Sequence, residues 1–260
     1  MSKIKLDKKN EIINLIHGGK SLNEISRKTG LSKTTIYYHY RKFHGKITTS
    51  PKIQKENIES LGEFIGVIAG DGYTNLTKNY KYLVRIFLNI KEEEYSDSLS
   101  DMLENFLGKR PHKYVHKKGN CIHLRFISKD IFYLIEEYLS WKSAGHRSKS
   151  RSICLRKIES DKKFKIGFLR GCVDTDGYIN KNRIMFSTAS KKLCKNIENF
   201  LQTLGIKFST RTYLDKRPNR SLMYYVNIKP DNREKFLSLI KPRNMRPPGF
   251  EPGYLPELKS

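Results

Sequence analysis

The chain has 260 residues, enough for one domain of ordinary size and a small appendage. Its 51 Lys and Arg residues against 26 Asp and Glu residues give a net charge of +25, which predicts a polyanionic partner, either nucleic acid or an acidic membrane. A membrane partner is disfavoured because the sequence has no apolar run of about 18 residues and no separate basic amphipathic helix.

The start of the chain and its cysteines indicate a cytoplasmic protein. Residues 1–9 carry four lysines and lack the apolar core of a secretory signal. The four cysteines, Cys121, Cys154, Cys172 and Cys194, are scattered and form no Cys-x-x-Cys pair. They are interpreted as reduced thiols, and a zinc site is not expected.

Residues 1–46 are predicted to form a small helical domain. Apolar residues at helical spacing indicate a first helix that stops at Gly18-Gly19. The sequence Ser21-Leu-Asn-Glu24 has the spacing of a capping box, and the helix that it opens ends at Gly30. Ser32 can cap a third helix. Two helices joined by a glycine-containing turn form the helix-turn-helix layout, whose second helix enters the DNA major groove.

The third helix carries the candidate contacts of this domain with DNA. Ile36, Tyr40 and Phe43 share one face at helical spacing. The candidate DNA-binding residues on the other faces are Lys33, Thr34, Thr35, Tyr37, Tyr38 and Arg41. A three-helix bundle used for protein contacts is the alternative, but residues 1–55 carry 13 Lys and Arg against 3 Asp and Glu, which favours DNA. Residues 47–57 contain a proline and no periodicity, and are predicted to be a linker.

Two later segments, Phe64–Gly72 and Phe168–Gly177, share a pattern. Each is a short apolar helix with a glycine in mid-run that ends in Asp-Gly, although an acid is unfavourable at the negative end of a helix. Small residues allow two helices to approach closely, and paired acids repel unless a divalent cation lies between them. The pattern therefore predicts a metal site formed by Asp71 and Asp176 at a helix–helix seam. Ordinary turn chemistry is the alternative for either copy alone.

Leu169–Gly177 resembles the LAGLIDADG motif of homing endonucleases, and Ile65–Gly72 resembles a degenerate first copy in which Ala69 replaces the earlier aspartate. The resemblance implies that the two motif helices pack at a pseudo-twofold axis. It also implies that Asp71 and Asp176, with the backbone carbonyls of Gly70 and Thr175, hold Mg²⁺ or Mn²⁺ against two scissile phosphates. The basic residues that the family uses to assist catalysis correspond to Arg147 or Lys149 and to Arg243 or Arg246.

From residue 58 onwards the chain is predicted to run twice through one order of elements. In both halves a motif helix precedes a hairpin, an amphipathic helix, a second hairpin and a third helix. The apolar residues of the amphipathic helix recur 98 positions later: Tyr95, Leu99, Leu103 and Phe106 correspond to Leu193, Ile197, Leu201 and Leu204. We therefore expect an α+β fold of two αββαββα halves, residues 58–150 and 151–260, that form a saddle of two antiparallel sheets.

Strand residues on the concave faces of such sheets lie along the DNA major groove. Because side chains alternate along a strand, every second residue lies on the DNA-facing side of the sheet. Arginine suits this side because its guanidinium group can pair with guanine edges or phosphates. The candidate DNA-binding residues of the sheets are Arg85, Asn89, Arg125, Arg183, Ser187 and Arg211.

Three functions remain open from the sequence. The first is a site-specific double-stranded DNA endonuclease that acts as a monomer through its two fused halves, with the helix-turn-helix lengthening its DNA footprint. The second is a non-catalytic DNA-binding regulator on the same scaffold, favoured by the N-terminal domain, by Ala69 and by the arginines at the second helper position. The third is an intron RNA maturase, which suits a major-groove helix-turn-helix less well.

Overall fold

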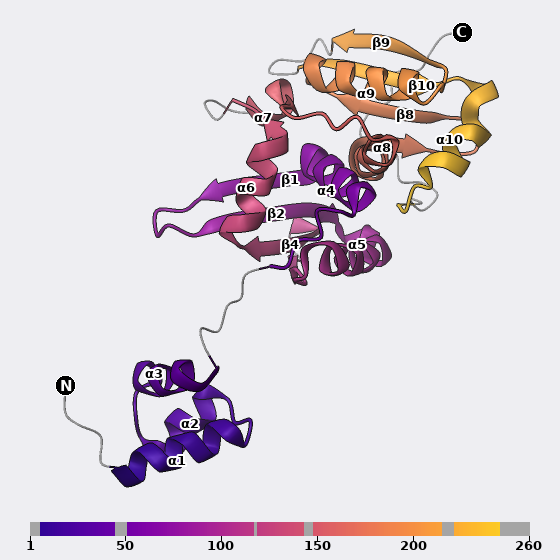
Figure 1. The fold of residues 1–260 in the computed structure, drawn as a ribbon. Helices are drawn as coiled ribbons and strands as arrows, with labels where there is room; N and C mark the ends of the chain where they lie inside the picture. Colours follow the sequence, from indigo (N-terminus) through magenta and orange to yellow (C-terminus); the bar gives the residue numbers. More distant parts are fainter. Residues whose placement is uncertain (1–5, 45–50, 117–118, 143–147, 215–220, 245–260) are drawn as a thin grey trace. The chain divides into compact units, whose positions relative to one another are not determined.

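The computed structural model describes residues 6–44, 51–116, 119–142, 148–214 and 221–244, and the chain divides into two compact units, Met1–Ser50 and Pro51–Ser260 (Figure 1). The first unit is helical, and the second contains two four-stranded antiparallel sheets. Within these described ranges, no helix is both long enough and apolar enough to cross a membrane.

The first unit consists of α1 (Leu6–His17), α2 (Leu22–Thr29) and α3 (Lys33–His44). The predicted capping box is present: the Ser21 hydroxyl accepts the Glu24 N–H at 3.3 Å, and the Glu24 carboxylate accepts the Ser21 N–H at 2.9 Å. Gly30 ends α2 with a left-handed backbone, φ 70°, which glycine adopts without a steric penalty. The predicted order of three helices is therefore confirmed, and they pack around Ile12, Ile16, Ile25 and Ile36.

His39 on α3 is buried, although the sequence pattern did not single it out. Its side chain is 7% exposed, and its Nδ1 atom has no hydrogen-bond partner among the described residues. Burial, together with the charges of Lys9 and Lys42, lowers the pKa of His39 below its usual value. The folded unit therefore favours the neutral imidazole.

We expect the first unit to lose stability as the pH falls below about 6.5, where histidine in an unfolded chain takes up a proton. The folded unit resists this proton because the pKa of His39 is lowered, so protonation favours unfolding. Hydrogen exchange of the α1–α3 amides in the full chain, corrected for intrinsic rates, should show less protection at low pH. His39→Leu should flatten this dependence; an unchanged dependence would assign it to another group.

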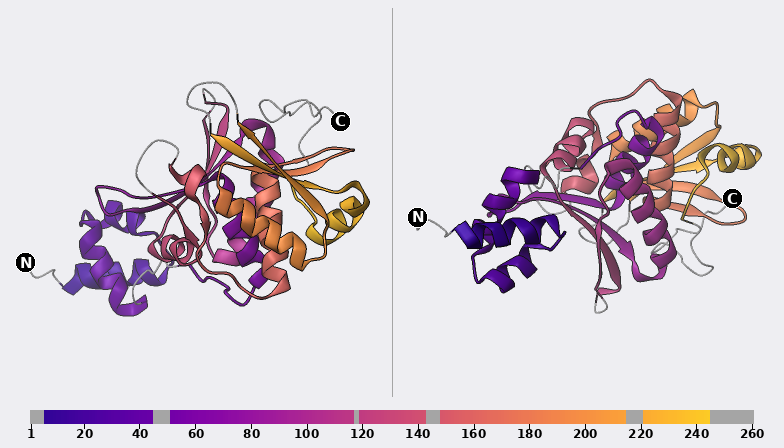
Figure 2. Two further views of the ribbon diagram at one scale, coloured as in Figure 1. Left: turned by 90° about the horizontal axis from the view of Figure 1, so that it is seen from above. Right: turned by 60° about the horizontal axis from the view of Figure 1, so that its bottom comes forward.

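The second unit repeats one order of elements. Its first half comprises α4 (Ile58–Asp71), β1 (Gly72–Leu76), β2 (Tyr82–Asn89), the 3₁₀ turn η1 (Ile90–Glu92), α5 (Glu93–Leu107), β3 (His112–His116), β4 (Cys121–Ile127) and α6 (Lys129–Tyr138). Its second half comprises α8 (Lys162–Asp176), β7 (Gly177–Ile179), β8 (Ile184–Thr188), α9 (Lys191–Thr203), β9 (Phe208–Leu214), β10 (Leu222–Ile228), η3 (Pro230–Asn232) and α10 (Arg233–Ile240). Between them lie β5 (Leu139–Ser140), α7 (Ser148–Ser152) and β6 (Cys154–Leu155). The predicted αββαββα order and the α+β class are confirmed (Figure 2).

The two sheets have matching topology, β1-β2-β4-β3 and β7-β8-β10-β9. In each sheet one face packs on helices, because α5 and α6 contact β4 and β2 while α9 contacts β8 and β10. The apolar residues that recur 98 positions apart are buried beneath these sheets in both halves. The opposite faces carry the polar and aromatic strand residues, which is the arrangement expected of a surface that binds a ligand as wide as a duplex.

Helices α4 and α8 form the seam between the halves, and glycines allow their backbones to touch. A Cβ atom on Gly66 would overlap the Phe168 carbonyl and lie 3.1 Å from the Cys172 nitrogen. A Cβ atom on Gly171 would likewise overlap the Glu63 carbonyl. Since real Cβ atoms do not approach backbone so closely, the seam requires glycine at both positions.

Candidate functional site

The candidate site lies where the two seam helices end. Asp71 is the last residue of α4 and Asp176 is the last residue of α8. The helices remain in contact up to this turn, because a Cβ atom on Gly70 would overlap Thr175 Oγ1 and lie 3.2 Å from Asp176 Oδ2. Asp71 is half-buried and Asp176 is exposed, so solvent reaches the pair. The structure thus brings these four predicted site residues together.

The amine of Lys149, on α7, lies beneath the same helix ends. Lys149 Nζ donates hydrogen bonds to the carbonyls of Ile68 at 2.9 Å, Gly70 at 2.9 Å and Gly72 at 2.5 Å. Burial lowers the pKa of Lys149 to about 8, although the nearby Asp176 and Asp71 favour its charged form. A cation at this point is stabilised by the partial negative charge of carbonyls at the C-terminal end of α4. Of the predicted basic helpers that the structure describes, Lys149 is therefore the one that lies beside the motif aspartates.

The donor set at the helix ends suits a hard divalent cation. No group of three His, Cys, Asp or Glu side chains in the described ranges could hold a metal ion. Mg²⁺ nevertheless keeps several waters and usually takes only one or two carboxylates, with substrate phosphates completing its coordination. Asp71 and Asp176 supply two carboxylates at a place that solvent reaches. The Gly70 carbonyl accepts Lys149 with one of its two lone pairs, so it can still take a second partner.

The other basic residues that were predicted to assist catalysis are not seen beside the motif aspartates. Arg147 and Arg246 lie outside the described residues. Arg243 Nε donates to Glu63 at 2.6 Å, and Glu63 lies two turns before Asp71, about 12 Å along α4 at a rise of ~1.5 Å per residue. This differs from the predicted place of Arg243 beside the catalytic acids. The physical reason is that the Glu63 carboxylate is 1% exposed and a buried charge needs partners.

Arg170 supplies the first cation of this buried cluster. Arg170 Nη1 donates to Glu63 at 2.9 Å and Nη2 donates to Glu59 at 2.6 Å, so α8 is joined to α4 across the seam. Its Nε also donates to the Ile240 carbonyl at 2.6 Å. Arg170 departs from the LAGLIDADG pattern, and the pattern gives it no role. The overlooked signal was the spacing of Glu59 and Glu63, which places two acids on one face of an otherwise apolar helix.

Residues 241–244, named here the C-terminal strap, continue this network across both halves. The Asp174 carboxylate, 1% exposed, accepts the backbone N–H groups of Arg243 at 3.0 Å and Asn244 at 3.1 Å. The Asn244 side chain donates to the Asp174 carbonyl at 2.7 Å and to Glu92 at 2.8 Å. Burial raises the pKa of Asp174 to about 7, while the backbone hydrogen bonds oppose that rise. Asn244 thereby ties Glu92 of the first half to the second motif helix.

The open face of the first sheet is basic and aromatic. Arg85 lies opposite both Tyr73 and Arg125 in the neighbouring strands. His123 lies opposite Phe87, with their ring centroids 4.7 Å apart. Asn89, a predicted DNA contact, uses its side-chain oxygen to accept the Lys91 N–H at 2.9 Å. This oxygen therefore caps η1.

The second sheet places its predicted DNA contacts differently. Arg211 is exposed. Arg183 is half-buried and donates to Asn227 Oδ1 at 3.0 and 2.9 Å, and burial together with Arg211 lowers its pKa. Ser187 donates to the Asp176 carbonyl at 2.8 Å, so it braces the end of the motif helix.

On α3 the predicted contacts are mostly accessible. Lys33, Thr34, Tyr38 and Arg41 are exposed, and Tyr37 is half-buried. Thr35 is engaged at the start of the helix: its N–H donates to Ser32 Oγ at 3.3 Å, and the two hydroxyls lie 2.9 Å apart.

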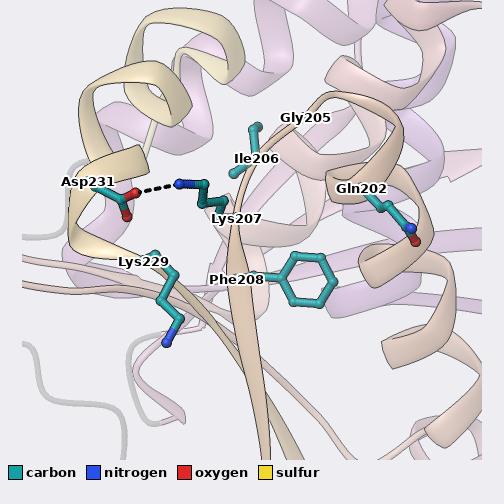
Figure 3. Close-up of a pocket in the computed structure, with 7 residues that line it drawn as sticks. All are labelled: Gln202, Gly205, Ile206, Lys207, Phe208, Lys229 and Asp231. Carbon is teal, nitrogen blue, oxygen red and sulfur yellow. Dashed lines mark hydrogen bonds and ion pairs between the residues drawn. The ribbon is translucent and has the colours of Figure 1, made fainter.

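A hollow lies elsewhere in the second half, at the turn between α9 and β9 (Figure 3). Its lining residues are Gln202, Gly205, Ile206, Lys207, Phe208, Lys229 and Asp231. Lys207 forms an ion pair with Asp231 at 3.1 Å across it. None of the predicted site residues lines this hollow.

Comparisons with known proteins agree with this architecture. Residues 163–241 match the protein family described as LAGLIDADG-like domain. The uncharacterized protein MJ0314 of Methanocaldococcus jannaschii is 24% identical over 173 residues, 63% of this chain and 61% of that protein. The uncharacterized protein MJ1054 of the same organism is 28% identical over 197 residues, 70% of this chain and 21% of that protein. The chain thus spans less than two thirds of either relative.

Solved structures of the homing endonuclease I-DmoI share the fold of the second unit. A structure of its mesophilic variants has a TM-score of 0.53 and 20% identity, and covers 71% of this chain and 97% of that one. A structure of I-DmoI in complex with DNA and Ca has a TM-score of 0.52 and 20% identity, and covers 71% of this chain and 90% of that one. The sequence-based resemblance to the LAGLIDADG family is confirmed.

Proposed function

We propose that this chain, a LAGLIDADG protein by its matched residues 163–241 and by its two-motif fold, is a site-specific endonuclease that cuts double-stranded DNA. It acts as a monomer, because a single chain supplies both motif helices. The net charge of +25 and the basic open face of the first sheet support a DNA partner.

The juxtaposition of Asp71 and Asp176 above the buried amine of Lys149 carries this proposal. Carboxylates at the negative ends of two adjacent helices lower stability unless they bind a cation. Two adjacent carboxylates that solvent reaches are ligands of the kind that Mg²⁺ or Mn²⁺ prefers.

The residues divide the reaction between them. When bound, a divalent cation supplies polarisation of the phosphate, a lower pKa for the attacking water and stabilisation of the leaving oxygen. Asp71 and Asp176 position it against the DNA backbone. Lys149, with a pKa of about 8, contributes positive charge and a transferable proton near neutral pH. The repeated order of the two halves suits two antiparallel DNA strands, with one half approaching each strand.

Lys149→Met is expected to lower the single-turnover cleavage rate by a factor on the order of 10² or more, because it removes charge and a proton donor from the site. Duplex affinity should change little, since Lys149 lies beneath the helix ends and its hydrogen bonds go to backbone carbonyls. Lys142→Met removes an exposed lysine of the same connecting region and serves as the control. Native cleavage by Lys149→Met, with an unchanged unfolding midpoint, would exclude a catalytic role for Lys149.

The proposal is tested by incubating the full chain with a randomised double-stranded DNA pool in Mg²⁺ or Mn²⁺. Recovery of products cut at one sequence supports an endonuclease. Salt-sensitive binding that selects a sequence, without cutting in either metal, would contradict it.

That second result would favour a DNA-binding regulator instead. The first unit supports this alternative, since it presents an exposed basic helix and contains neither motif aspartate. Selective binding of structured RNA in competition with the DNA pool would favour a maturase.

A further inference from the structure

The chain between the units is fixed to the second unit before α4 begins. Ile53 packs against the core of that unit, and the Gln54 N–H donates to the Phe106 carbonyl at 2.9 Å. A Cβ atom on Gly108 would lie 2.9 Å from the Lys52 backbone nitrogen and oxygen. The segment that was predicted as a linker is therefore anchored from Lys52 onwards at the C-terminal end of α5.

This anchor lies at the outer edge of the first half. Gly108 ends α5, and β3 begins four residues later. In the sheet order β1-β2-β4-β3, β1 continues directly from the seam helix α4, whereas β3 is the opposite edge strand. Figure 1 shows β1, β2 and β4 at increasing distance from α8. The chain therefore leaves the second unit on the side of the first half that is remote from the candidate metal site.

The covalent connection limits where α3 can bind DNA. Helix α3 ends at His44, and eight residue steps lead from there to the anchor at Lys52. A fully extended chain spans at most about 3.6 Å per residue, so this connection reaches no more than about 29 Å. At a rise of about 3.4 Å per base pair, that distance is roughly eight base pairs. Helix α3 itself adds roughly 18 Å for its 12 residues at ~1.5 Å each.

We propose that the DNA target is bipartite and asymmetric, with α3 reading a second element on the first-half side of the cleavage site only. This inference rests on the proposed function. The element lies within roughly 14 base pairs of the outer edge of the first half, which is the sum of the two reaches. Helix α3 is equipped to read it, because Lys33, Thr34, Tyr38 and Arg41 are exposed on one helix while Ile36 is buried beneath them. Among the described residues, the elements that follow the motif helix in the second half repeat those of the first half, with no second helix-turn-helix beside them.

Hydroxyl-radical footprinting of the full chain on its selected target tests the proposal. Native protein should protect a longer stretch on one flank than on the other. The double variant Lys33→Ala, Arg41→Ala should lose that extra stretch and bind at least about tenfold more weakly, because it removes two charged contacts with the duplex. The control is Arg27→Ala, Lys28→Ala, which removes two exposed charges from α2 and should keep the footprint.

Two further measurements test on which side of the cleavage site the second DNA element lies and how far from the second unit α3 can bind it. The first measurement is energy transfer from a donor dye on Lys109→Cys, in a chain whose half-buried Cys121 and Cys154 are replaced by Ser. Transfer should be more efficient to an acceptor at the duplex end with the extra protected stretch than to an acceptor at the other end. Six Gly and Ser residues inserted between Thr49 and Ser50 should allow the second element to lie up to about six base pairs farther out. Extra protection at the opposite duplex end, or at both ends, would overturn the inference. Extra protection that persists in the double variant of α3 would overturn it as well. No selective binding at all would overturn the proposed function with it.

Discussion

Replacing Asp71 or Asp176 by Asn is expected to reduce double-strand cleavage by a factor of about 10² to 10³, which is the scale seen when one preorganised electrostatic group is removed. Asparagine keeps the size of the side chain but removes the negative charge that a divalent cation requires. Each single substitution should suffice, because the two carboxylates lie at adjacent helix ends and both would hold the proposed cation.

The binding of DNA should respond in the opposite direction. Both carboxylates repel phosphates when no cation is present, so each variant should bind the duplex as tightly as the native chain or more tightly. Rapid-quench cleavage and gel-shift assays of the same preparations separate the two effects. Asp101→Asn removes an exposed acid of α5 and is the matched control. If Asp176→Asn cleaved DNA at the native rate, the catalytic cation would have to be held by other residues.

The second large effect is expected at the glycines of the seam. Gly66→Ala and Gly171→Ala should each lower the free energy of unfolding of the second unit by about 3 kcal/mol, the upper end of overpacking costs. Each added Cβ atom would overlap a backbone carbonyl of the facing helix, so the whole helix must move. The sign is diagnostic, because glycine to alanine in the middle of an unconstrained helix stabilises by about 1 kcal/mol.

Urea unfolding measures this effect through the single tryptophan, Trp141, which packs against the core of the second unit. Lys163→Ala, an exposed substitution on α8, should leave the midpoint within the range of ordinary surface changes. If both glycine substitutions left the free energy of unfolding unchanged or raised it, the two helices could separate without loss of stability. The close approach of α4 and α8 would then not be required for folding.

The architecture was predictable because it depends on patterns that repeat within short stretches. The apolar positions of α5 and α9 recur at a fixed offset and are buried in both halves, from Tyr95 to Leu204. The capping box at Ser21 and the left-handed Gly30 are local features, whose physics involves only their own helix. The closeness of Asp71 and Asp176 was also predictable, since each acid is unfavourable at its own helix end, whereas their role as metal ligands stays a prediction.

The polar partners of the site were less predictable because they join residues far apart in sequence. Glu63 pairs with Arg170 and Arg243, and nothing in the sequence near Glu63 indicates either partner. Asn89 and Ser187 were assigned to the DNA-facing strands by alternation, and that assignment stays a prediction. In the structure both make short intramolecular hydrogen bonds, which alternation along a strand cannot reveal.

During synthesis, the seam cannot acquire its full set of charged contacts until the C-terminal strap has left the ribosome. Arg170 follows Glu63 by 107 residues and Arg243 follows it by 180. At translation rates of about 5–20 residues per second, Glu63 waits on the order of ten seconds or more for its second cation. Until Arg243 is made, Arg170 alone must compensate the charges of Glu63 and Glu59, so α4 is expected to stay exposed to water or to chaperones during this interval. A truncated chain that ends before Arg243 should therefore be a preferred substrate for proteolysis at α4, and the two halves should become protease-resistant together rather than in sequence.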